Sequence, residues 1–156
     1  MPFVHIHIAG SEIAASQIQR LQTQATHLMA AIMGKKAELT SVLVEHTSKA
    51  CWSVGGAPVR VAAHLDVKVT AGTNTPEEKA AFIAAANQLF KDTLGQELPL
   101  ATYVVVHEIA ADTWGYGGCT QAGSPPRSRL ATRASPPAWG DIAVVEILKR
   151  TTQATG

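Results

Sequence analysis

Two short segments decide the fold: Cys51–Gly56 reads CWSVGG, and Thr113–Gly118 reads TWGYGG, 62 positions later. The same offset relates Ala9–Gly10 to Ala71–Gly72. It also relates three residues of one segment to three of another: Thr40, Val42 and Val44 match Thr102, Val104 and Val106. About eight identities at a single offset, spread along the chain, indicate two copies of one structural unit.

The first unit is predicted to fold as strand, helix, strand. Residues 3–8 alternate and are rich in β-branched side chains, which is typical of a strand, and residues 9–11 break it. Apolar residues within 14–33 recur at spacings of three and four, so they share one face of a helix that Gly34 ends. Residues 41–45 form the second predicted strand.

The second unit repeats this order. Residues 65–69 are predicted to form a strand. Thr75 is a favourable N-cap and Pro76 suits the first helical position, so a helix is expected from there to about Leu94. Residues 102–109 form the fourth predicted strand.

The units combine into one α+β domain over residues 1–118, with unit one at 2–56, a linker at 57–62 and unit two at 63–118. A strand–helix–strand unit of this length favours parallel pairing with a right-handed crossover. Tandem β-α-β units therefore predict a four-stranded sheet with two helices on one face. The other face is expected to be apolar and uncovered, which favours oligomerisation. The Pro/Ser-rich tail 119–156 is expected to be poorly ordered or to pack on a neighbouring subunit.

Composition narrows the class of protein. A chain of 156 residues that is 46% hydrophobic can bury a core, and a net charge of +1 without a dense basic block argues against nucleic-acid binding. No stretch approaches the roughly 18 consecutive apolar residues of a membrane span, and the start lacks the pattern of a signal peptide. Cys51 and Cys119 are too few for a disulfide framework. We expect a cytoplasmic protein without a membrane partner.

Proline directly after the initiator Met, then strand, helix, strand and an aromatic-x-x-Gly-Gly segment, resembles the 4-oxalocrotonate tautomerase family. These features are Pro2, residues 3–8 and Trp52–Gly56, and the second copy ending in Trp114–Gly118 resembles the fused, two-unit members. The resemblance covers residues 2 to about 118. It implies a tautomerase-like fold, a homotrimer, a small-molecule substrate, no cofactor and a proton-transfer role for Pro2.

The physical reading of Pro2 agrees with that role. A small residue after Met1 permits removal of Met1, which leaves Pro2 as a secondary amine with no peptide bond to consume its lone pair. A partly desolvated pocket disfavours the charged amine and lowers its pKa towards neutrality. Such a base can take a proton from a carbon beside a carbonyl and return it at another carbon. Pro2 can otherwise simply begin a strand.

The chain departs from the family at the arginines that bind acidic substrates. Alignment puts Ser11 and Thr73 at the first arginine site, and Ser41 and Tyr103 at the second. In the family, arginines at these positions pair with the carboxylates of acidic substrates. Because this chain has none there, the resemblance does not imply the dicarboxylate substrate of the namesake enzyme. Arg60, in the linker, is our candidate substitute, with a solvated linker charge as the alternative.

The family's aromatic position is filled by Trp52 and Trp114, which the resemblance places in the pocket wall beside the amine. Tyr103 and Thr73 are two further candidates for substrate binding. Glu108 matches a recurrent family glutamate and is interpreted as structural rather than catalytic. At the offset of 62, Pro2 corresponds to His64, which is mid-chain and cannot offer a free amine.

Several alternatives stay open. His5 and His7 lie on one face of a strand, which is compatible with a metal site, but no Cys/His/Asp cluster with ligand spacing supports one, so no metal is assigned. Relatives also use the proline for dehalogenation, hydration or decarboxylation of small acids. A non-catalytic binding protein on the same fold is the alternative from a different functional class. Tautomerisation ranks first.

Overall fold

A computed structural model describes residues 1–10 and 12–123, which form an α+β fold. Within these residues no helix is long and apolar enough to cross a bilayer. The two α-helices are α1 (Ala15–Ala31) and α2 (Pro76–Leu94), and two short 3-10 helices are η1 (Ala37–Leu39) and η2 (Lys49–Cys51). The strands are β1 (Phe3–Gly10), β2 (Ser41–Ser48), β3 (Ser53–Val54), β4 (Ala57–Pro58), β5 (Ala62–Thr70), β6 (Tyr103–Ile109), β7 (Gly115–Tyr116) and β8 (Cys119–Thr120).

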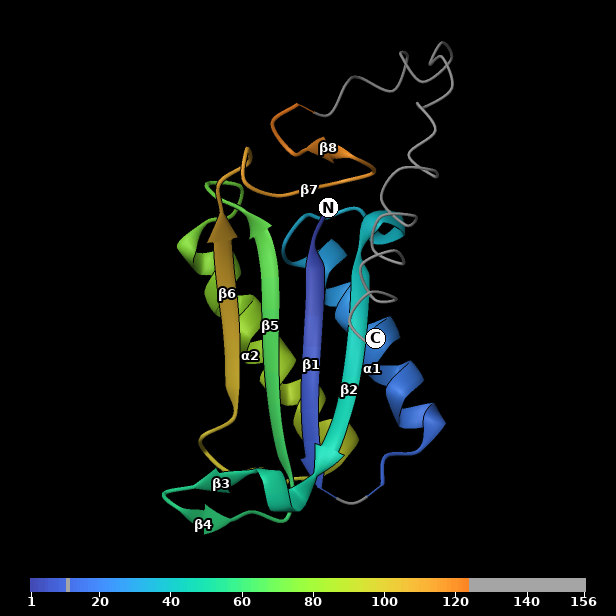
Figure 1. The fold of residues 1–156 in the computed structure, drawn as a ribbon, viewed down its shortest axis with the longest axis vertical. Helices are drawn as coiled ribbons and strands as arrows, with labels where there is room; N and C mark the ends of the chain where they lie inside the picture. The colour runs from blue at the N-terminus through green and yellow to red at the C-terminus, as the bar shows by residue number, and fades with distance from the viewer. Residues whose placement is uncertain (11, 124–156) are drawn as a thin grey trace, which may run out of the picture. The chain divides into compact units, whose positions relative to one another are not determined.

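The main sheet has the order β2-β1-β5-β6 (Figure 1). β1 pairs with β2 in parallel and β5 pairs with β6 in parallel, as the crossover argument predicts. The two units join through the antiparallel pair of β1 and β5, in which Phe3 lies opposite Lys68. Both helices lie behind the sheet in Figure 1, so the predicted four-stranded sheet with two helices on one face is confirmed.

The core lies between the sheet and the two helices. Alternate residues of β1 and β5 are fully buried against buried positions of α1 and α2, because strand side chains alternate between the two sheet faces. The principal members are Val4, Ile6, Leu65, Val67, Leu21, Met29, Phe82 and Phe90. The N-terminus of α2 has the predicted cap, since the Thr75 hydroxyl accepts from the Glu78 backbone N–H and Glu78 reciprocates.

Three of the four main strands are longer than their sequence pattern indicates, while β6 begins one residue later than predicted. β1 runs to Gly10 and β2 to Ser48, because β1 is paired on both sides and the ladder continues past the alternating segment. Gly10 has φ of 148°, and a Cβ there would lie 3.0 Å from the Arg60 carbonyl oxygen. The expected linker 57–62 is likewise not free loop, since Ala57–Pro58 is a strand and Ala62 begins β5.

Each aromatic-x-x-Gly-Gly segment contributes to a small hairpin. Gly55–Gly56 joins β3 to β4 and Gly117–Gly118 joins β7 to β8, and all four glycines have positive φ, between 57° and 79°. Two consecutive positive φ angles are what a tight two-residue hairpin turn requires, and glycine adopts them without strain. The second hairpin includes Cys119 and Thr120, so the folded unit extends beyond the expected boundary at 118. The remainder of the tail, 124–156, lies outside the described residues.

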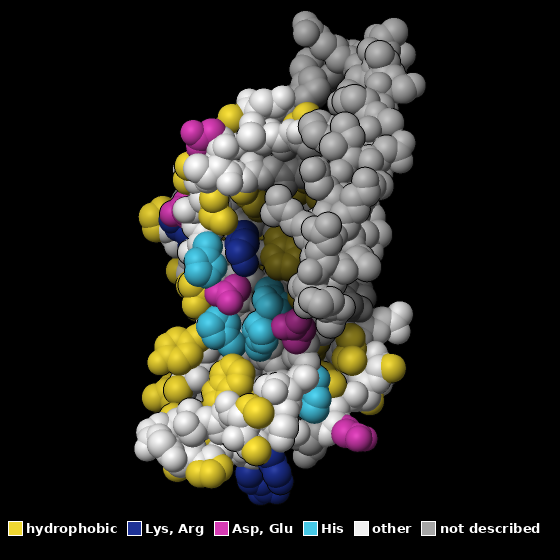
Figure 2. Space-filling model, viewed as in Figure 1, with side chains coloured by type: hydrophobic (Ala, Val, Ile, Leu, Met, Phe, Trp, Pro, Cys, Tyr) yellow, Lys and Arg dark blue, Asp and Glu magenta, His cyan; other side chains and the backbone are white. Residues whose placement is uncertain are grey.

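The sheet face without helices differs from the expected apolar surface. Figure 2 shows histidine side chains gathered there between acidic and basic ones, with apolar side chains around them. On this open face lie Phe3, His5, His7, Leu43, Glu45, His64, Asp66, Lys68, Tyr103 and His107. Polar residues can occupy it because period-two alternation puts every core side chain on the opposite face.

Candidate active site

Pro2 is buried immediately before β1, and its carbonyl oxygen accepts a hydrogen bond of 3.3 Å from the Ser41 N–H. It continues the buried alternation of Val4 and Ile6, which places it on the helix side of the sheet. A cavity of about 100 Å³ adjoins it, lined by Met1, Pro2, Lys35, Val69, Thr70 and Thr73. Pro2 therefore lies beside a small space that also contains an amine side chain and a hydroxyl.

Lys35 reaches this cavity because α1 ends just before it. Gly34 has φ of 64° and reverses the chain, after which the Lys35 N–H donates to the Met29 carbonyl at 2.9 Å. The Lys35 Nζ then donates to Thr73 Oγ1 at 2.8 Å, and Thr73 Oγ1 donates to the Thr70 carbonyl at 2.7 Å. Lys35 is the only cationic side chain that lines the cavity in the described part of the chain.

The loop that holds Thr73 is fastened to the end of α1. Asn74 Nδ2 lies 2.9 Å from the Met33 carbonyl oxygen and 2.9 Å from Glu78 Oε2. Glu78 belongs to the capping box of α2, so one side chain links the loop to both helices. Lys35 and Thr73 thus sit on two segments whose separation is fixed by hydrogen bonds.

The surroundings lower the pKa values of both amines at this cavity. In the structure Met1 still precedes Pro2, and burial, followed by the charge of Lys35, lowers the pKa of the terminal amine below 8.0. Burial also lowers the pKa of Lys35 below 10.5, against the opposing effect of Glu78. Two amines in one partly desolvated space disfavour each other's charge, which favours a neutral base beside a cation.

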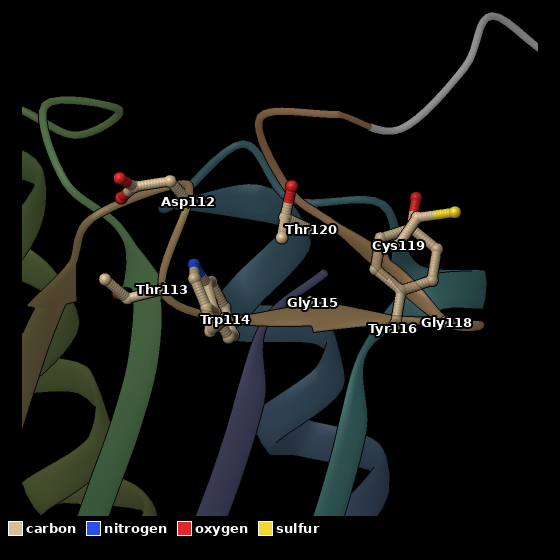
Figure 3. Close-up of a pocket in the computed structure, with 8 residues that line it drawn as sticks. All are labelled: Asp112, Thr113, Trp114, Gly115, Tyr116, Gly118, Cys119 and Thr120. Carbon is tan, nitrogen blue, oxygen red and sulfur yellow. The ribbon is translucent and has the colours of Figure 1, made fainter.

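The hairpin of β7 and β8 brings Trp114 to the same end of the sheet. Gln121 joins the hairpin to the N-terminus, because its N–H donates to the Trp114 carbonyl at 2.9 Å and its Nε2 to the Met1 carbonyl at 3.3 Å. A cavity of about 370 Å³ lies along the hairpin, and Figure 3 shows Trp114 and Tyr116 at the two ends of β7. Trp114 Nε1 is buried and has no hydrogen-bond partner among the described residues. It is therefore an unsatisfied donor that needs an acceptor from outside the described residues.

Three predicted site residues lie towards the other end of the sheet. Tyr103 is opposite His64, which is opposite His7, so it is five residues from Pro2 along β1, roughly 16 Å. Trp52 follows η2, beyond the end of β2 where Ser48 pairs with Gly10. Within one chain, neither side chain lies at the Pro2 cavity.

Arg60 is also distant from Pro2. It precedes Ala62, which pairs with Ala9, so it lies roughly 23 Å or more from Pro2. Its side chain is 90% exposed, and its Nη1 lies 3.7 Å from Glu97 Oε2. The structure brings Lys35, rather than Arg60, to Pro2. Lys35 is not among the site residues predicted from the sequence, and the signal that could have found it is Gly34, which ends the helix and directs Lys35 towards the cavity.

The remaining candidates, Glu108 and His64, do not line the Pro2 cavity. Ser11 lies outside the described residues. Glu108 Oε1 accepts from the Gly72 N–H at 3.2 Å and Oε2 from Lys79 Nζ at 2.8 Å; the Lys79 hydrogen bond, then that of Gly72, lowers its pKa. Glu108 thus supports the β5–α2 loop. His64 faces the open side of the sheet while Pro2 faces the helices, so by orientation Ala63 is the counterpart of Pro2.

Comparison with known proteins identifies the family. The chain is 39% identical over 54 residues to "Probable tautomerase K2" of Dickeya dadantii (strain 3937), which covers 35% of this chain and 79% of that protein. The chain belongs to the tautomerase family. The family model described as "Tautomerase enzyme" matches residues 64–120, which include most of β5 and all of α2, β6 and the second hairpin.

Solved structures agree with this assignment at the level of the fold. A native fused 4-OT matches with a TM-score of 0.67 at 23% identity, covering 77% of this chain and 96% of that one. A fused 4-OT asymmetric trimer matches with a TM-score of 0.68 at 21% identity over the same shares. A macrophage migration inhibitory factor-like protein from Entamoeba histolytica has a TM-score of 0.62 at 16% identity, over 76% and 97%. The tautomerase superfamily fold, resembling the fused 4-OT proteins, is therefore confirmed.

Proposed function

We propose that this chain is a tautomerase in which Pro2, freed by removal of Met1, is the general base. The observation that carries the proposal is the position of Pro2, buried beside a cavity that it shares with Lys35 and Thr73. Burial, and then the charge of Lys35, lowers the pKa of the Met1 amine at this cavity, and the same surroundings would favour the neutral form of a Pro2 amine. Family membership supports the reaction class.

The proposed reaction is a 1,3-proton transfer. The Pro2 nitrogen takes a proton from the carbon next to a carbonyl, the electron pair of that C–H bond forms a C=C bond, and the carbonyl π pair moves to oxygen. The resulting pyrrolidinium returns the proton at the other end of the enol or dienol system. Pro2 ends the cycle neutral, and no net electrons or protons are exchanged with solvent.

Lys35 supplies the positive charge for the substrate in this proposal. Its ammonium can bind a carboxylate or the developing enolate oxygen, and Thr73 holds it in place through the 2.8 Å hydrogen bond. The Trp114 indole N–H offers a further donor at the same end of the sheet. A cavity of about 100 Å³ with Met1 present fits a small substrate, so we favour a 2-oxo acid or its enol.

Trp52, Tyr103 and Arg60 can contribute to a Pro2 pocket only from another copy of the chain, because the rigid sheet separates them from Pro2. We propose a homotrimer, the assembly named for fused 4-OT structures that share the fold. The exposed Tyr103 and Leu43 give the open face apolar area that such an assembly would cover.

Covalent labelling tests the proline mechanism. The structural neighbour Pt0534 is described as inactivated by 2-oxo-3-pentynoate, an electrophilic ynone acid. We expect this reagent to add to the Pro2 nitrogen of the processed chain, and peptide mass spectrometry to locate the adduct on Pro2. The matched control inserts glycine before Pro2, which converts the amine into an amide and should abolish labelling.

Turnover is measured on the same two proteins with phenylenolpyruvate and other enols of 2-oxo acids. The processed chain should accelerate ketonisation and the glycine-extended chain should not. Labelling of Pro2 without turnover of any enol would favour the binding-protein alternative. Turnover that survives the glycine extension would overturn the role of Pro2.

A further inference from the structure

The open face of the sheet holds a compact group of three side chains that the proposed reaction does not use. His5 Nε2 lies 2.8 Å from Glu45 Oε2, and His7 Nδ1 lies 3.4 Å from the same oxygen. The two imidazoles also approach each other, with His7 Nε2 3.2 Å from His5 Nδ1. One ligand atom from each of the three residues lies within 4.8 Å of the other two.

Two of these separations, from Glu45 Oε2 to His5 Nε2 and to His7 Nδ1, are close to those between ligand atoms in a metal coordination sphere. A tetrahedral zinc ion with metal–ligand distances of about 2.0–2.1 Å keeps its ligand atoms about 3.3 Å apart. Two imidazoles and one carboxylate are a ligand set that zinc uses in proteins, with a further position open to water. We propose that His5, His7 and Glu45 form a binding site for one divalent transition metal ion, for which Zn²⁺ is the probe.

The backbone holds the three ligands in place before any ion binds. Alternation puts His5 and His7 on the same side of β1, and the parallel register places Glu45 of β2 directly beside His7. β1 is paired on both sides, so its side chains project from the rigid interior of the sheet. Preorganised ligands on strands lower the entropy cost of binding an ion.

The surrounding charges divide into two groups. Asp66 Oδ1 lies 2.6 Å from His107 Nε2 and Asp66 Oδ2 lies 3.2 Å from His64 Nε2, so this carboxylate is engaged with the second histidine pair. Lys68 Nζ lies over the ring of Phe3, 5.3 Å from its centroid. Glu45 consequently remains the carboxylate next to His5 and His7. Among the described residues, only His5, His7 and Glu45 form a group with metal-ligand spacing.

The sequence did not predict this site because the third ligand, Glu45, is remote from His5 and His7 in sequence. His5 and His7 alone supply two ligands, and parallel pairing of β1 with β2 brings the third from 40 positions away. The site is on the face of the sheet opposite to Pro2, so metal binding and proton transfer are separable properties.

Titration calorimetry with ZnCl₂ tests the proposal on the full, untagged chain after treatment with EDTA. We expect saturable binding of one ion per chain, and Co²⁺ substitution should give the intense visible bands of a four-coordinate site. His7→Gln and Glu45→Gln should each weaken Zn²⁺ binding by about 100-fold or more, since loss of even an indirect partner of a ligand costs 10–100-fold. Far-UV circular dichroism establishes that both variants fold.

Two matched control variants distinguish Zn²⁺ binding at this site from weak Zn²⁺ binding by other histidines. His27→Gln changes an exposed histidine of α1, and His107→Gln changes a histidine on the same open face that contacts Asp66. Both should bind Zn²⁺ as the wild type does. The proposal is overturned if the wild type shows no saturable binding, if His7→Gln and Glu45→Gln bind normally, or if the loss appears in His107→Gln instead.

Discussion

The Nζ of Lys35 lies 2.8 Å from the Oγ1 of Thr73, and this contact joins the end of α1 to the loop after β5 beside Pro2. One residue belongs to each half of the chain. The site at Pro2 is therefore assembled from both units, although only the first unit begins with the proline.

Lys35→Met should weaken the binding of acidic substrates. A charge-assisted hydrogen bond to a carboxylate contributes about 1.5–3 kcal/mol, so KM for a 2-oxo acid should rise about tenfold or more. Removing the charge also raises the pKa of the terminal amine, because Lys35 lowers it. The ascending limb of the pH–rate profile should therefore move to higher pH. Lys36→Met, at the exposed neighbouring position, is the control and should change neither quantity.

Arg60→Ala distinguishes the two candidate cations. Because Arg60 is exposed, paired with Glu97 and distant from Pro2, we expect its loss to change KM by less than about twofold, as for most exposed ion pairs. The measurement is the same steady-state assay as for Lys35→Met. If KM instead rises as much as in Lys35→Met, the anion is bound by Arg60 of another copy of the chain.

Much of the fold could be predicted from the sequence. Alternation identified the first strand, the repeat indicated the order of the other three, and Thr75 and Pro76 placed the start of α2 correctly because capping chemistry is local. Strand ends could not be predicted as well, since Gly10 and Ser48 are held in the ladder by partners remote in sequence.

The candidate site was less predictable, because its geometry depends on which face of the sheet each residue occupies and on how the loops bring distant residues together. The repeat offset of 62 aligned Pro2 with His64, yet a one-residue difference between the first strands of the two units turns these residues to opposite faces. The sequence pointed to Arg60 and not to Lys35 because sequence position does not show that Gly34 directs Lys35 back to the N-terminus. Thr73 was selected by alignment, and the structure does place it at the Pro2 cavity.

The assembly is tested by light scattering coupled to size-exclusion chromatography. We expect a mass about three times the 16.4 kDa of the chain at micromolar concentration. Tyr103, which is 61% exposed on the open face, offers a perturbation: Tyr103→Glu should shift the population towards smaller species by placing a charge in the contact. A stable monomer in the wild type contradicts the trimer.

Truncation locates the end of the folded unit. A chain that ends at Gly123 keeps the hydrogen bond of the Gln121 N–H to the Trp114 carbonyl and that of the Ala122 N–H to the Ala111 carbonyl. It should melt at the same temperature as the full chain by circular dichroism. A chain that ends at Gly118 loses β8 and these contacts, so its kcat/KM should fall even if it folds. Aggregation of the Gly123 chain would show that residues after 123 cover an apolar surface.

Pro2→Ala gives the sharpest test of the mechanism. The substitution leaves a primary amine close to the original position, so we expect kcat/KM to fall by up to about 10²–10⁴-fold, the usual contribution of a general base. In the wild type the rate should rise with pH and level off at a lower pH than an exposed amine would give, because burial and Lys35 lower the pKa of an amine at this cavity. Blocking the amine by retained Met1 should remove both the rate and the ascending limb. Intact-mass spectrometry of the active preparation should find a chain that begins at Pro2; activity in a preparation that keeps Met1 would exclude the proline base.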